Sequence, residues 1–376
     1  MVDLKIKLEK NSALLLFIIL IGFLIRVWNL PNKAFGVDEE LTLKVTNSVS
    51  EAIAFSNSDF YPPLSHALFV PLLASFGVVG TRIFLAILSS FAVLLFYFFS
   101  KKFFEEEEAL LSTMLFAIMP LNVFYSAHLR QYPVLIFLNL LAAYCFISLL
   151  QKFSWKHILL FSFACILMGY IHYTSWLYVL AFGILIVIFF RKRTQFKIFL
   201  GAIATILACL ALLLPLALSQ YSHFTQTHYY KEKNAFNLSS YLYIFYKLAV
   251  GINISSALSF CPLLLFAAVL VLLFLAIGFW LFLHEKEPKA RVLSIYFLLS
   301  LALFFFASLK APMLASFRYL SPTMPVFVLF LSKGLFSIGS KKSAIANIII
   351  ALFWLIAICY YYSVFTQPDW NKFIGL

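Results

Sequence analysis

The stretch that organises this chain reads Gly36-Val-Asp-Glu-Glu40 at its start and Asn57-Ser-Asp-Phe-Tyr-Pro-Pro-Leu-Ser-His66 at its end. It is a polar loop between long apolar segments, and it holds five of the fifteen acidic residues of the chain. These five are Asp38, Glu39, Glu40, Glu51 and Asp59. Carboxylates that gather in one loop of so apolar a chain indicate a functional role for that loop.

The composition around this loop is that of a membrane protein. Of 376 residues, 64% are hydrophobic and only 11% are charged, whereas soluble domains are about 45–50% apolar and about 25% charged. The mean hydropathy is +0.98, and apolar runs close to the length that crosses a bilayer recur throughout. We therefore expect an all-α polytopic membrane protein, since a helix satisfies its own backbone hydrogen bonds in lipid.

The positions of lysine and arginine predict the topology. Five basic clusters lie between apolar runs: Lys101-Lys102, Lys152/Lys156, Arg191-Lys192-Arg193, Lys286/Lys289/Arg291 and Lys341-Lys342. All of them fall on the cytoplasmic side if segment 64–79 does not cross and lies in the outer interface instead. This predicts about eleven spans, over 12–30, 82–101, 108–123, 129–150, 157–171, 173–190, 197–219, 260–283, 292–309, 317–336 and 343–363.

This topology predicts one transmembrane domain over residues 1–376, with the N-terminus in the cytoplasm. The acidic residues then lie outside, in a first outer loop over 31–81, and residues 220–258 form a second, large outer loop. The net charge of +13 is explained by topology, and we expect no nucleic acid partner. The aromatic residues of the loop at 220–258 suit either stacking on a sugar or a belt at the membrane interface.

Two kinds of charged residue lie on the predicted outer side. The Asp38-Glu39 pair could bind a divalent cation or take a proton from an attacking hydroxyl, and its alternative role is loop solubility. Four arginines lie at the outer ends of helices, where each could hold a phosphate or extend to the headgroups. They are Arg26, Arg82, Arg130 and Arg318. Their occurrence on the same side as the carboxylates predicts a phosphate-bearing ligand, such as a lipid phosphate.

The order of these motifs resembles that of a known family. It runs Arg26, Asp38-Glu39, Pro62-Pro63-Leu64, Arg82, Met119-Pro120, Ser126-Ala127-His128-Leu129-Arg130-Gln131-Tyr132, His172-Tyr173-Thr174, Arg318-Tyr319-Leu320-Ser321-Pro322 with Pro325, and Asp369-Trp370. It is similar to membrane glycosyltransferases of the GT-C type, in the branch of protein O-mannosyltransferases and the aminoarabinose transferase of lipid A. One departure is that many relatives have an acid two residues before the Pro-Pro pair. Here Asp59 is one position earlier.

The resemblance implies a GT-C fold and a reaction. A polyprenyl-phosphate donor would give its hexose or pentose, with inversion, to a lipid, glycan or protein acceptor on the outer face of the cell membrane. Such transfers build lipopolysaccharide or glycoproteins. Many relatives continue into a soluble outer domain, which is not expected within residues 1–376.

The resemblance also implies roles for individual residues. Asp38 would be the general base, Glu39 would position the acceptor or a metal, and a divalent metal ion is left open as a cofactor. The donor phosphate would be held by Arg26, Arg82, Arg130 and Arg318. Further candidates for substrate binding are Asp59, His66, Tyr132, His172, Tyr173 and Tyr319.

Two other classes of function use the same residues differently. A transporter or flippase of lipid-linked sugars would bind phosphate without chemistry, and it should carry ionisable residues along a path inside the spans. Almost none lie in mid-span, which favours the enzyme. A non-catalytic membrane scaffold would leave the acidic loop without a role.

Overall fold

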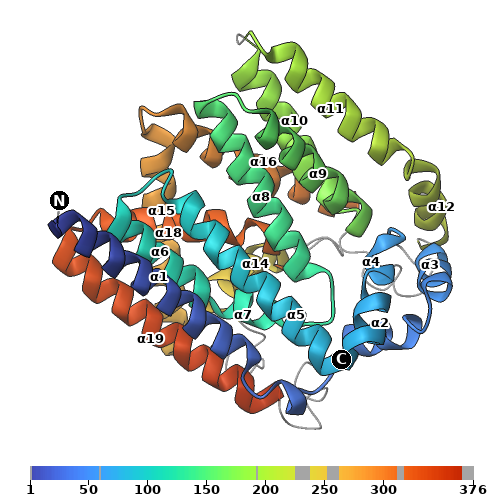
Figure 1. Ribbon diagram of the computed structural model, residues 1–376, viewed down its shortest axis with the longest axis horizontal. Coiled ribbons are helices and arrows are strands. Elements are labelled where there is room, and N and C mark those ends of the chain that lie inside the picture. The colour runs from blue at the N-terminus through green and yellow to red at the C-terminus, as the bar shows by residue number, and fades with distance from the viewer. Residues whose placement is uncertain are drawn as a thin grey trace.

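The computed structural model describes residues 2–58, 61–191, 194–224, 238–251, 262–310 and 317–365. Every regular element in these ranges is helical, which confirms the all-α expectation (Figure 1). Seven helices are long and apolar enough to cross a membrane, and up to nine spans result if each of two bent pairs counts as one. The helices α9 (Trp155–Ile171) and α10 (Ser175–Phe190) are apolar but shorter. The number eleven therefore stays a prediction.

Each predicted span nevertheless overlaps a helix of the structure. The long helices are α1 (Val2–Val27), α5 (Phe69–Ser100), α8 (Tyr132–Gln151), α15 (Pro262–His284), α16 (Pro288–Lys310) and α19 (Ser340–Phe365). The others are α2 (Val37–Val45), α3 (Val49–Ser58), α4 (Leu64–Ala67), α6 (Glu106–Ile118), α7 (Pro120–Ser126), α11 (Phe196–Ala211), α12 (Leu214–Phe224), α14 (Leu238–Val250), α17 (Phe317–Leu320) and α18 (Met324–Phe336). Helix α14 falls within the segment predicted as a large outer loop.

Two spans that the sequence predicts as continuous are broken. Helices α6 and α7 meet at 57°, and α11 meets the following helix at 45°. The first break lies at Met119, whose ψ of 118° is not helical. Its cause is Pro120, because a proline ring disfavours the helical conformation of the residue before it. The break matters for the site, since α7 leads into the turn that carries Arg130.

The predicted interface segment 64–79 and the following span are joined, with a break between them. Gly77 has φ 60° and ψ −171°, and it interrupts α5. The run Leu64–Ser100 is 37 residues long, about 55 Å of helix at 1.5 Å per residue, against about 30 Å of hydrocarbon. The whole run is therefore too long to cross upright. The break at Gly77 separates the part predicted to lie in the interface from the span.

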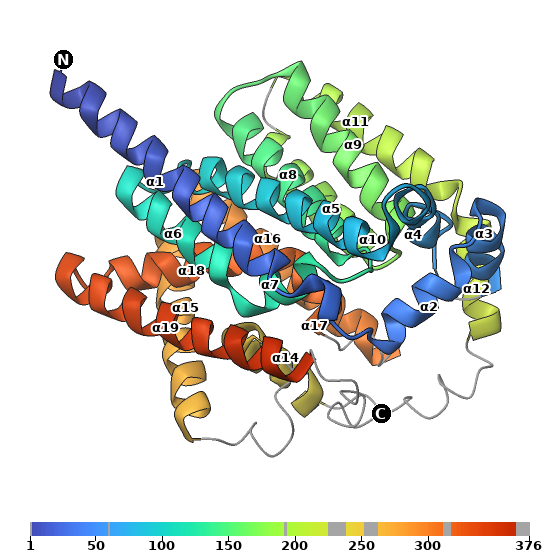
Figure 2. The same ribbon diagram turned by 60° about the horizontal axis from the view of Figure 1, so that its bottom comes forward.

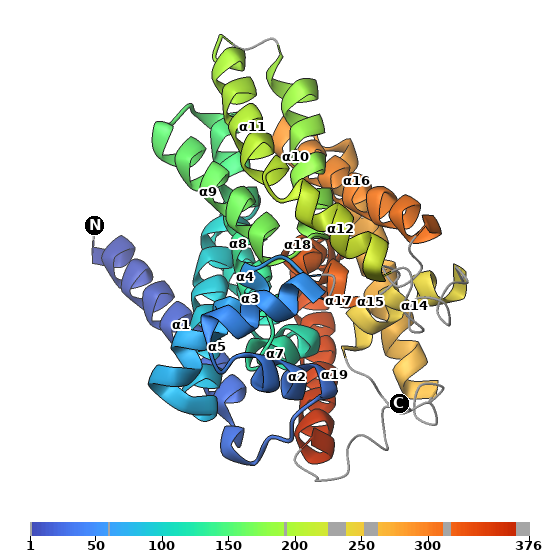
Figure 3. The ribbon, with the colours of Figure 1, turned by 90° about the vertical axis from the view of Figure 1, so that its right-hand side faces the viewer.

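The loops sort to two ends of the helical bundle. Helices α2, α3 and α4 lie together at one end, and α1 begins at the other (Figure 2). At the end where α1 begins, Lys102 Nζ donates to Gln151 Oε1 over 3.2 Å, and Lys289 Nζ lies 6.0 Å from the ring of Phe103. Three of the basic clusters thus gather opposite the acidic loop. At the acidic end, α3 packs against α12 (Figure 3).

Helices α15 and α18 are in backbone contact. A Cβ added at Gly278 would lie 1.7 Å from the carbonyl oxygen of Phe330, and one added at Gly334 would lie 1.9 Å from that of Phe274. Small residues allow such close approach of helices in membranes. This contact fixes α18, the helix that follows Arg318 in the chain.

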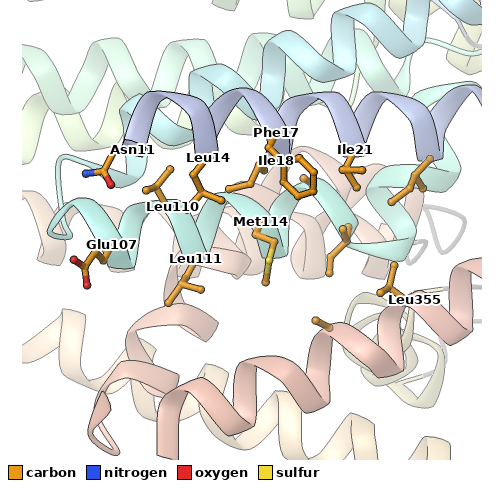
Figure 4. Close-up of a pocket in the computed structure, with 14 residues that line it drawn as sticks. Asn11, Leu14, Phe17, Ile18, Ile21, Glu107, Leu110, Leu111, Met114 and Leu355 are labelled. Carbon is orange, nitrogen blue, oxygen red and sulfur yellow. The ribbon is translucent and has the colours of Figure 1, made fainter. Parts of the chain in front are cut away.

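A cavity of about 870 Å³ lies between α1, α6 and α19. Figure 4 shows Leu14, Phe17, Ile21 and Met114 among the side chains that line it. Asn11 and Glu107 are its polar lining residues, so it suits hydrocarbon chains. It lies along the apolar helices, and Asp38 does not line it.

Candidate active site

The two adjacent acids Asp38 and Glu39 have different surroundings. Helix α2 begins after Gly36, so that Glu39 is its third residue and Asp38 its second. Glu39 turns back and accepts a hydrogen bond from the backbone N–H of Gly36 over 3.2 Å, as in one half of a capping box. Asp38 points elsewhere, and its side chain is 38% exposed.

Glu39 is sealed inside the protein at 1% exposure. Its Oε1 accepts hydrogen bonds from Arg82 Nη2 over 3.1 Å and from the backbone N–H of Leu129 over 2.9 Å. Burial raises the pKa of Glu39, but its electrostatic contacts with His128, Lys33 and Arg82 outweigh burial and lower it to about 2. Glu39 is therefore a buried anion with its hydrogen-bonding capacity largely used.

Arg82 belongs to the same buried set of contacts as Glu39. Besides Glu39, it donates to the carbonyl oxygen of Lys33 over 2.9 Å and lies over the ring of Phe35. Lys33 Nζ in turn donates to the carbonyl oxygen of Ala127 over 3.1 Å. We call Lys33, Glu39, Arg82 and their bonds to residues 127 and 129 the Glu39 brace. It ties the acidic loop to α5 and to the turn before α8.

Asp38 forms an ion pair with Arg318. Arg318 Nη1 donates to Asp38 Oδ2 over 3.0 Å, although 280 residues separate them in sequence. Burial raises the pKa of Asp38, but the positive charges of Arg130 and Arg318 outweigh burial and hold it below its usual range. Asp38 is therefore an ionised and accessible carboxylate beside two guanidinium groups.

Arg130 is completely buried, at 0% exposure. It donates to the hydroxyl of Tyr61 over 2.7 Å, to Nε2 of His66 over 3.0 Å and to the hydroxyl of Thr42 over 3.3 Å. These partners are two hydroxyl groups and an imidazole, and its Nε has no partner among the described residues. Within the described ranges no carboxylate forms an ion pair with it. A buried cation held only by neutral groups favours the binding of an anion beside it.

Aromatic rings form the back of the site. The ring of Tyr61 lies 5.1 Å from that of His66 and 6.0 Å from that of His172. His172 in turn lies 5.3 Å from Tyr319, so the rings come from three parts of the chain: residues 61–66, residue 172 and residue 319. Tyr132 is buried and close enough for the charges of Arg318 and Arg130 to act on it. We call Asp38, Tyr61, His66, Arg130, Tyr132, His172, Arg318 and Tyr319 the Asp38 cluster.

Two further predicted residues, Arg26 and Tyr173, lie outside both this cluster and the Glu39 brace. Arg26 donates to the carbonyl oxygens of Gly22 and Ala117, each over 2.8 Å, and to Ser89 Oγ over 2.9 Å. Ala117 is in the last turn of α6, whose terminal carbonyls lose their helical partners at the break. Tyr173 donates to Gln220 Oε1 over 2.7 Å. Arg26 thus braces the break between α6 and α7, and Tyr173 braces α12.

The predicted residues Asp59 and Asp369-Trp370 lie outside the described ranges. Three residues that contribute to the site were not predicted: Lys33, Thr42 and Tyr61. Lys33 is the single cation between the first span and the acids, and Tyr61 directly precedes the Pro-Pro pair, so both had a readable signal in the sequence.

The residues present do not fit a metal ion at the Asp38-Glu39 pair. Both oxygens of Glu39 already accept hydrogen bonds. Asp38 faces Arg318, a cation. Within the described part of the chain no group of three His, Cys, Asp or Glu side chains is placed to hold a metal.

This geometry can be compared with known proteins. Residues 62–218 match the family model of dolichyl-phosphate-mannose-protein mannosyltransferases. The apo structure of ArnT from Cupriavidus metallidurans superposes with a TM-score of 0.59 at 11% identity, over 91% of this chain and 62% of that chain. No curated protein matches the sequence.

Two further solved structures share the fold and contain lipid phosphates. ArnT from Cupriavidus metallidurans bound to undecaprenyl phosphate has a TM-score of 0.57 at 11% identity, over 90% of this chain and 62% of that chain. The oligosaccharyltransferase AglB from Archaeoglobus fulgidus, in complex with an inhibitory peptide and a dolichol-phosphate, gives 0.57 at 14% identity. That match covers 97% of this chain and 59% of AglB. This chain thus spans about three fifths of the length of these proteins. Residues 62–218 thus resemble the mannosyltransferase family model, and the chain shares the fold of ArnT and AglB.

Proposed function

We propose that this protein transfers a sugar from a polyprenyl-phosphate donor to an acceptor hydroxyl, with Asp38 as the general base. The observation that carries the proposal is the pairing of one exposed, ionised carboxylate with Arg318 and Arg130. A donor of this kind brings an anionic phosphate for the arginines and an anomeric carbon beside the carboxylate. The lipid phosphates present in two structures of the same fold support the choice of ligand.

The step that we propose is a single displacement at the anomeric carbon. Asp38 takes the proton of the acceptor hydroxyl, whose oxygen forms the new bond to the anomeric carbon. The bond from that carbon to the phosphate oxygen breaks, and its electron pair stays on the departing polyprenyl phosphate. The configuration is therefore inverted. A placed general base contributes about 10²–10⁴-fold to such a step.

Arg318 and Arg130 supply the positive charge for the departing phosphate. Guanidinium groups hold phosphate oxygens through paired hydrogen bonds. Arg318 must leave Asp38 when phosphate binds, and this exchange frees the carboxylate for the acceptor. Charge stabilisation of this type acts most strongly where negative charge develops in the transition state.

The proposal assigns Glu39 to positioning rather than to an acceptor or a metal. Its brace fixes the start of α2, from which Asp38 extends. Glu39 thereby orients the base through the backbone, without contact with the substrate. The donor sugar is a hexose or a pentose, and the acceptor is a lipid, glycan or protein.

The proposed site is on the outer face of the membrane. Three basic clusters lie at the bundle end opposite the acidic loop, and cytoplasmic loops are enriched in such residues. Labelling by an impermeant reagent in intact cells, with a single cysteine at the exposed position of Glu40 on α2 and the native cysteines replaced, tests this side.

The decisive experiment uses purified protein and a radiolabelled polyprenyl-phosphate sugar. Asp38→Asn should bind the donor but lose transfer by at least about 100-fold. The matched control is Glu40→Gln, because Glu40 is an exposed acid two positions along the same helix. Full transfer by Asp38→Asn contradicts the proposal. Donor translocation across reconstituted vesicles without donor consumption would instead identify a flippase.

A further inference from the structure

One polar atom at the back of the Asp38 cluster has no hydrogen-bond partner among the residues that the structure describes. It is Nε2 of His172, in a side chain that is only 6% exposed. The imidazole lies between α9 and α10, next to the rings of Tyr319 and Tyr61. An unpaired buried polar atom is destabilising, because it has lost its hydrogen bonds to water without replacement. Such an atom at the edge of a candidate site indicates a partner that arrives with the ligand.

The surrounding backbone fixes what this atom offers. The backbone N–H of Thr174 donates to Nδ1 of His172 over 3.2 Å, and the Thr174 hydroxyl oxygen lies 2.8 Å from the same nitrogen. An Nδ1 that accepts this bond carries no proton, so that the neutral ring carries its proton on Nε2. Burial and the charges of Arg130 and Arg318 lower the pKa of His172 to about 3, which keeps it neutral near pH 7. His172 therefore presents one fixed N–H donor and no free acceptor.

A lone donor beside two guanidinium groups matches an oxygen that only accepts. His172 reaches both arginines through its ring neighbours: Arg318 lies 5.3 Å from the ring of Tyr319, and Arg130 donates to the hydroxyl of Tyr61. A phosphate oxygen accepts without donating, and the two arginines already attract one. A sugar hydroxyl would bring a hydrogen as well, for which His172 has no free acceptor.

We propose that Nε2–H of His172 donates a hydrogen bond to a phosphate oxygen of the donor lipid, as a third ligand beside Arg130 and Arg318. This inference rests on the proposed function and assigns a role to one more residue of the same site. His172 holds the phosphate and transfers no proton. The bond strengthens as the phosphodiester becomes a phosphomonoester, because the departing group gains negative charge.

The test measures both binding and turnover in two variants. His172→Phe keeps a ring against Tyr319 and Tyr61 and removes the donor, whereas His172→Gln offers an amide N–H in its place. We expect His172→Phe to weaken binding of short-chain polyprenyl phosphate by about 10- to 100-fold and to lower kcat with it. His172→Gln should recover most of both losses.

His157→Phe is the matched control, since His157 lies at the opposite end of α9 from His172 and also has an unpaired ring nitrogen. It should bind polyprenyl phosphate like the wild type. The inference is overturned if His172→Phe binds and turns over normally. It is equally overturned if His172→Gln is as impaired as His172→Phe, because the loss then follows ring shape.

Failure of this inference is distinguishable from failure of the proposed function. Asp38→Asn should still bind polyprenyl phosphate while losing transfer. If Asp38→Asn binds the lipid phosphate without transfer and His172→Phe binds and turns over normally, the proposed reaction is supported and the proposed role of His172 is wrong. If Asp38→Asn retains full transfer, the proposed function itself is wrong.

Discussion

Arg318 donates a hydrogen bond to Asp38 over 3.0 Å and thereby joins the two ends of the chain at one point. The proposed base and a proposed phosphate ligand thus neutralise each other in the absence of substrate. Both are partly exposed, at 38% and 29%, so water screens the pair and its contribution to stability is small. The pair is therefore easily exchanged for a phosphate, which fits a binding site better than a structural contact.

Removal of Arg318 should change the pH dependence of transfer. The charges of Arg130 and Arg318 hold the pKa of Asp38 below its usual range. In Arg318→Gln that pKa rises, so Asp38 becomes protonated at a higher pH than in the wild type. We expect the acidic limb of kcat/KM to move to higher pH, together with a higher KM for the donor. The measurement is kcat/KM across the acidic range.

The matched control for this shift is Arg291→Gln. Arg291 is an exposed arginine on α16, among the basic residues at the other end of the bundle. Its removal should leave the acidic limb unchanged. An unshifted limb in Arg318→Gln would mean that the titrating group is not Asp38.

Neutralisation of Glu39 should destabilise the fold rather than only the reaction. Glu39→Gln leaves Arg82 buried without its anion, and breaking a buried ion pair in this way costs about 3–5 kcal/mol. The exposed neighbour Glu40 provides the comparison, since Glu40→Gln should change stability by less than about 0.5 kcal/mol. Thermal unfolding in detergent, followed by tryptophan fluorescence, measures both.

The stability that Glu39 contributes should also depend on pH. Its pKa of about 2 is below the value of about 4.3 for an unfolded chain. The contribution is therefore fully present above the unfolded value and is lost as pH falls through the folded one. Wild type and Glu39→Gln should converge in stability towards this acidic range. If the difference in stability between wild type and Glu39→Gln stays constant as the pH falls, Glu39 is not a buried anion.

Substitution of Arg26 should affect the fold and leave donor affinity alone. Arg26→Met removes hydrogen bonds to Ser89 and to carbonyls near the break between α6 and α7. We expect a loss of about 1–3 kcal/mol for the unsatisfied groups, with a donor KM within about twofold of wild type. Ser89→Ala should lose less. A large rise in KM with normal stability would restore Arg26 as a phosphate ligand.

Tyr61 should act on donor binding through Arg130. Tyr61→Phe keeps the ring that stacks on the guanidinium but removes the hydroxyl that accepts its hydrogen bond. We expect a rise in the donor KM of about 3- to 10-fold, as for one hydrogen bond to a charged group. Arg130→Lys should be worse, because an ammonium cannot reproduce the fork of donors. Equal increases of the donor KM in Tyr61→Phe and Arg130→Lys would contradict the proposal that Tyr61 acts through Arg130.

Much of this fold could be predicted from local sequence, but the division of roles within the site could not. Apolar runs predicted where each span lies, because hydrophobicity over some twenty residues is a local property. The break before Pro120 also had a local signal, and so did the capping position of Glu39 behind Gly36. The separation of Arg26 and Arg82 from Arg130 had none. All four are arginines at helix ends, and only packing decides which meets a backbone carbonyl, a carboxylate or open space.

The glycine contact between α15 and α18 holds one side of the site in a fixed position. With Gly278 and Gly334 pressed against facing backbones, α18 has no room to slide or rotate. The segment before it is pinned as well, since Tyr178 donates to the carbonyl oxygen of Tyr319 and Asn139 to that of Pro322. Arg318 is therefore held from the side of α18, and Asp38 is held from the other side by the Glu39 brace at the start of α2. Under the proposed function, acceptors of different bulk would then be accommodated by changes in α3 and α4, while Asp38 and Arg318 keep their positions.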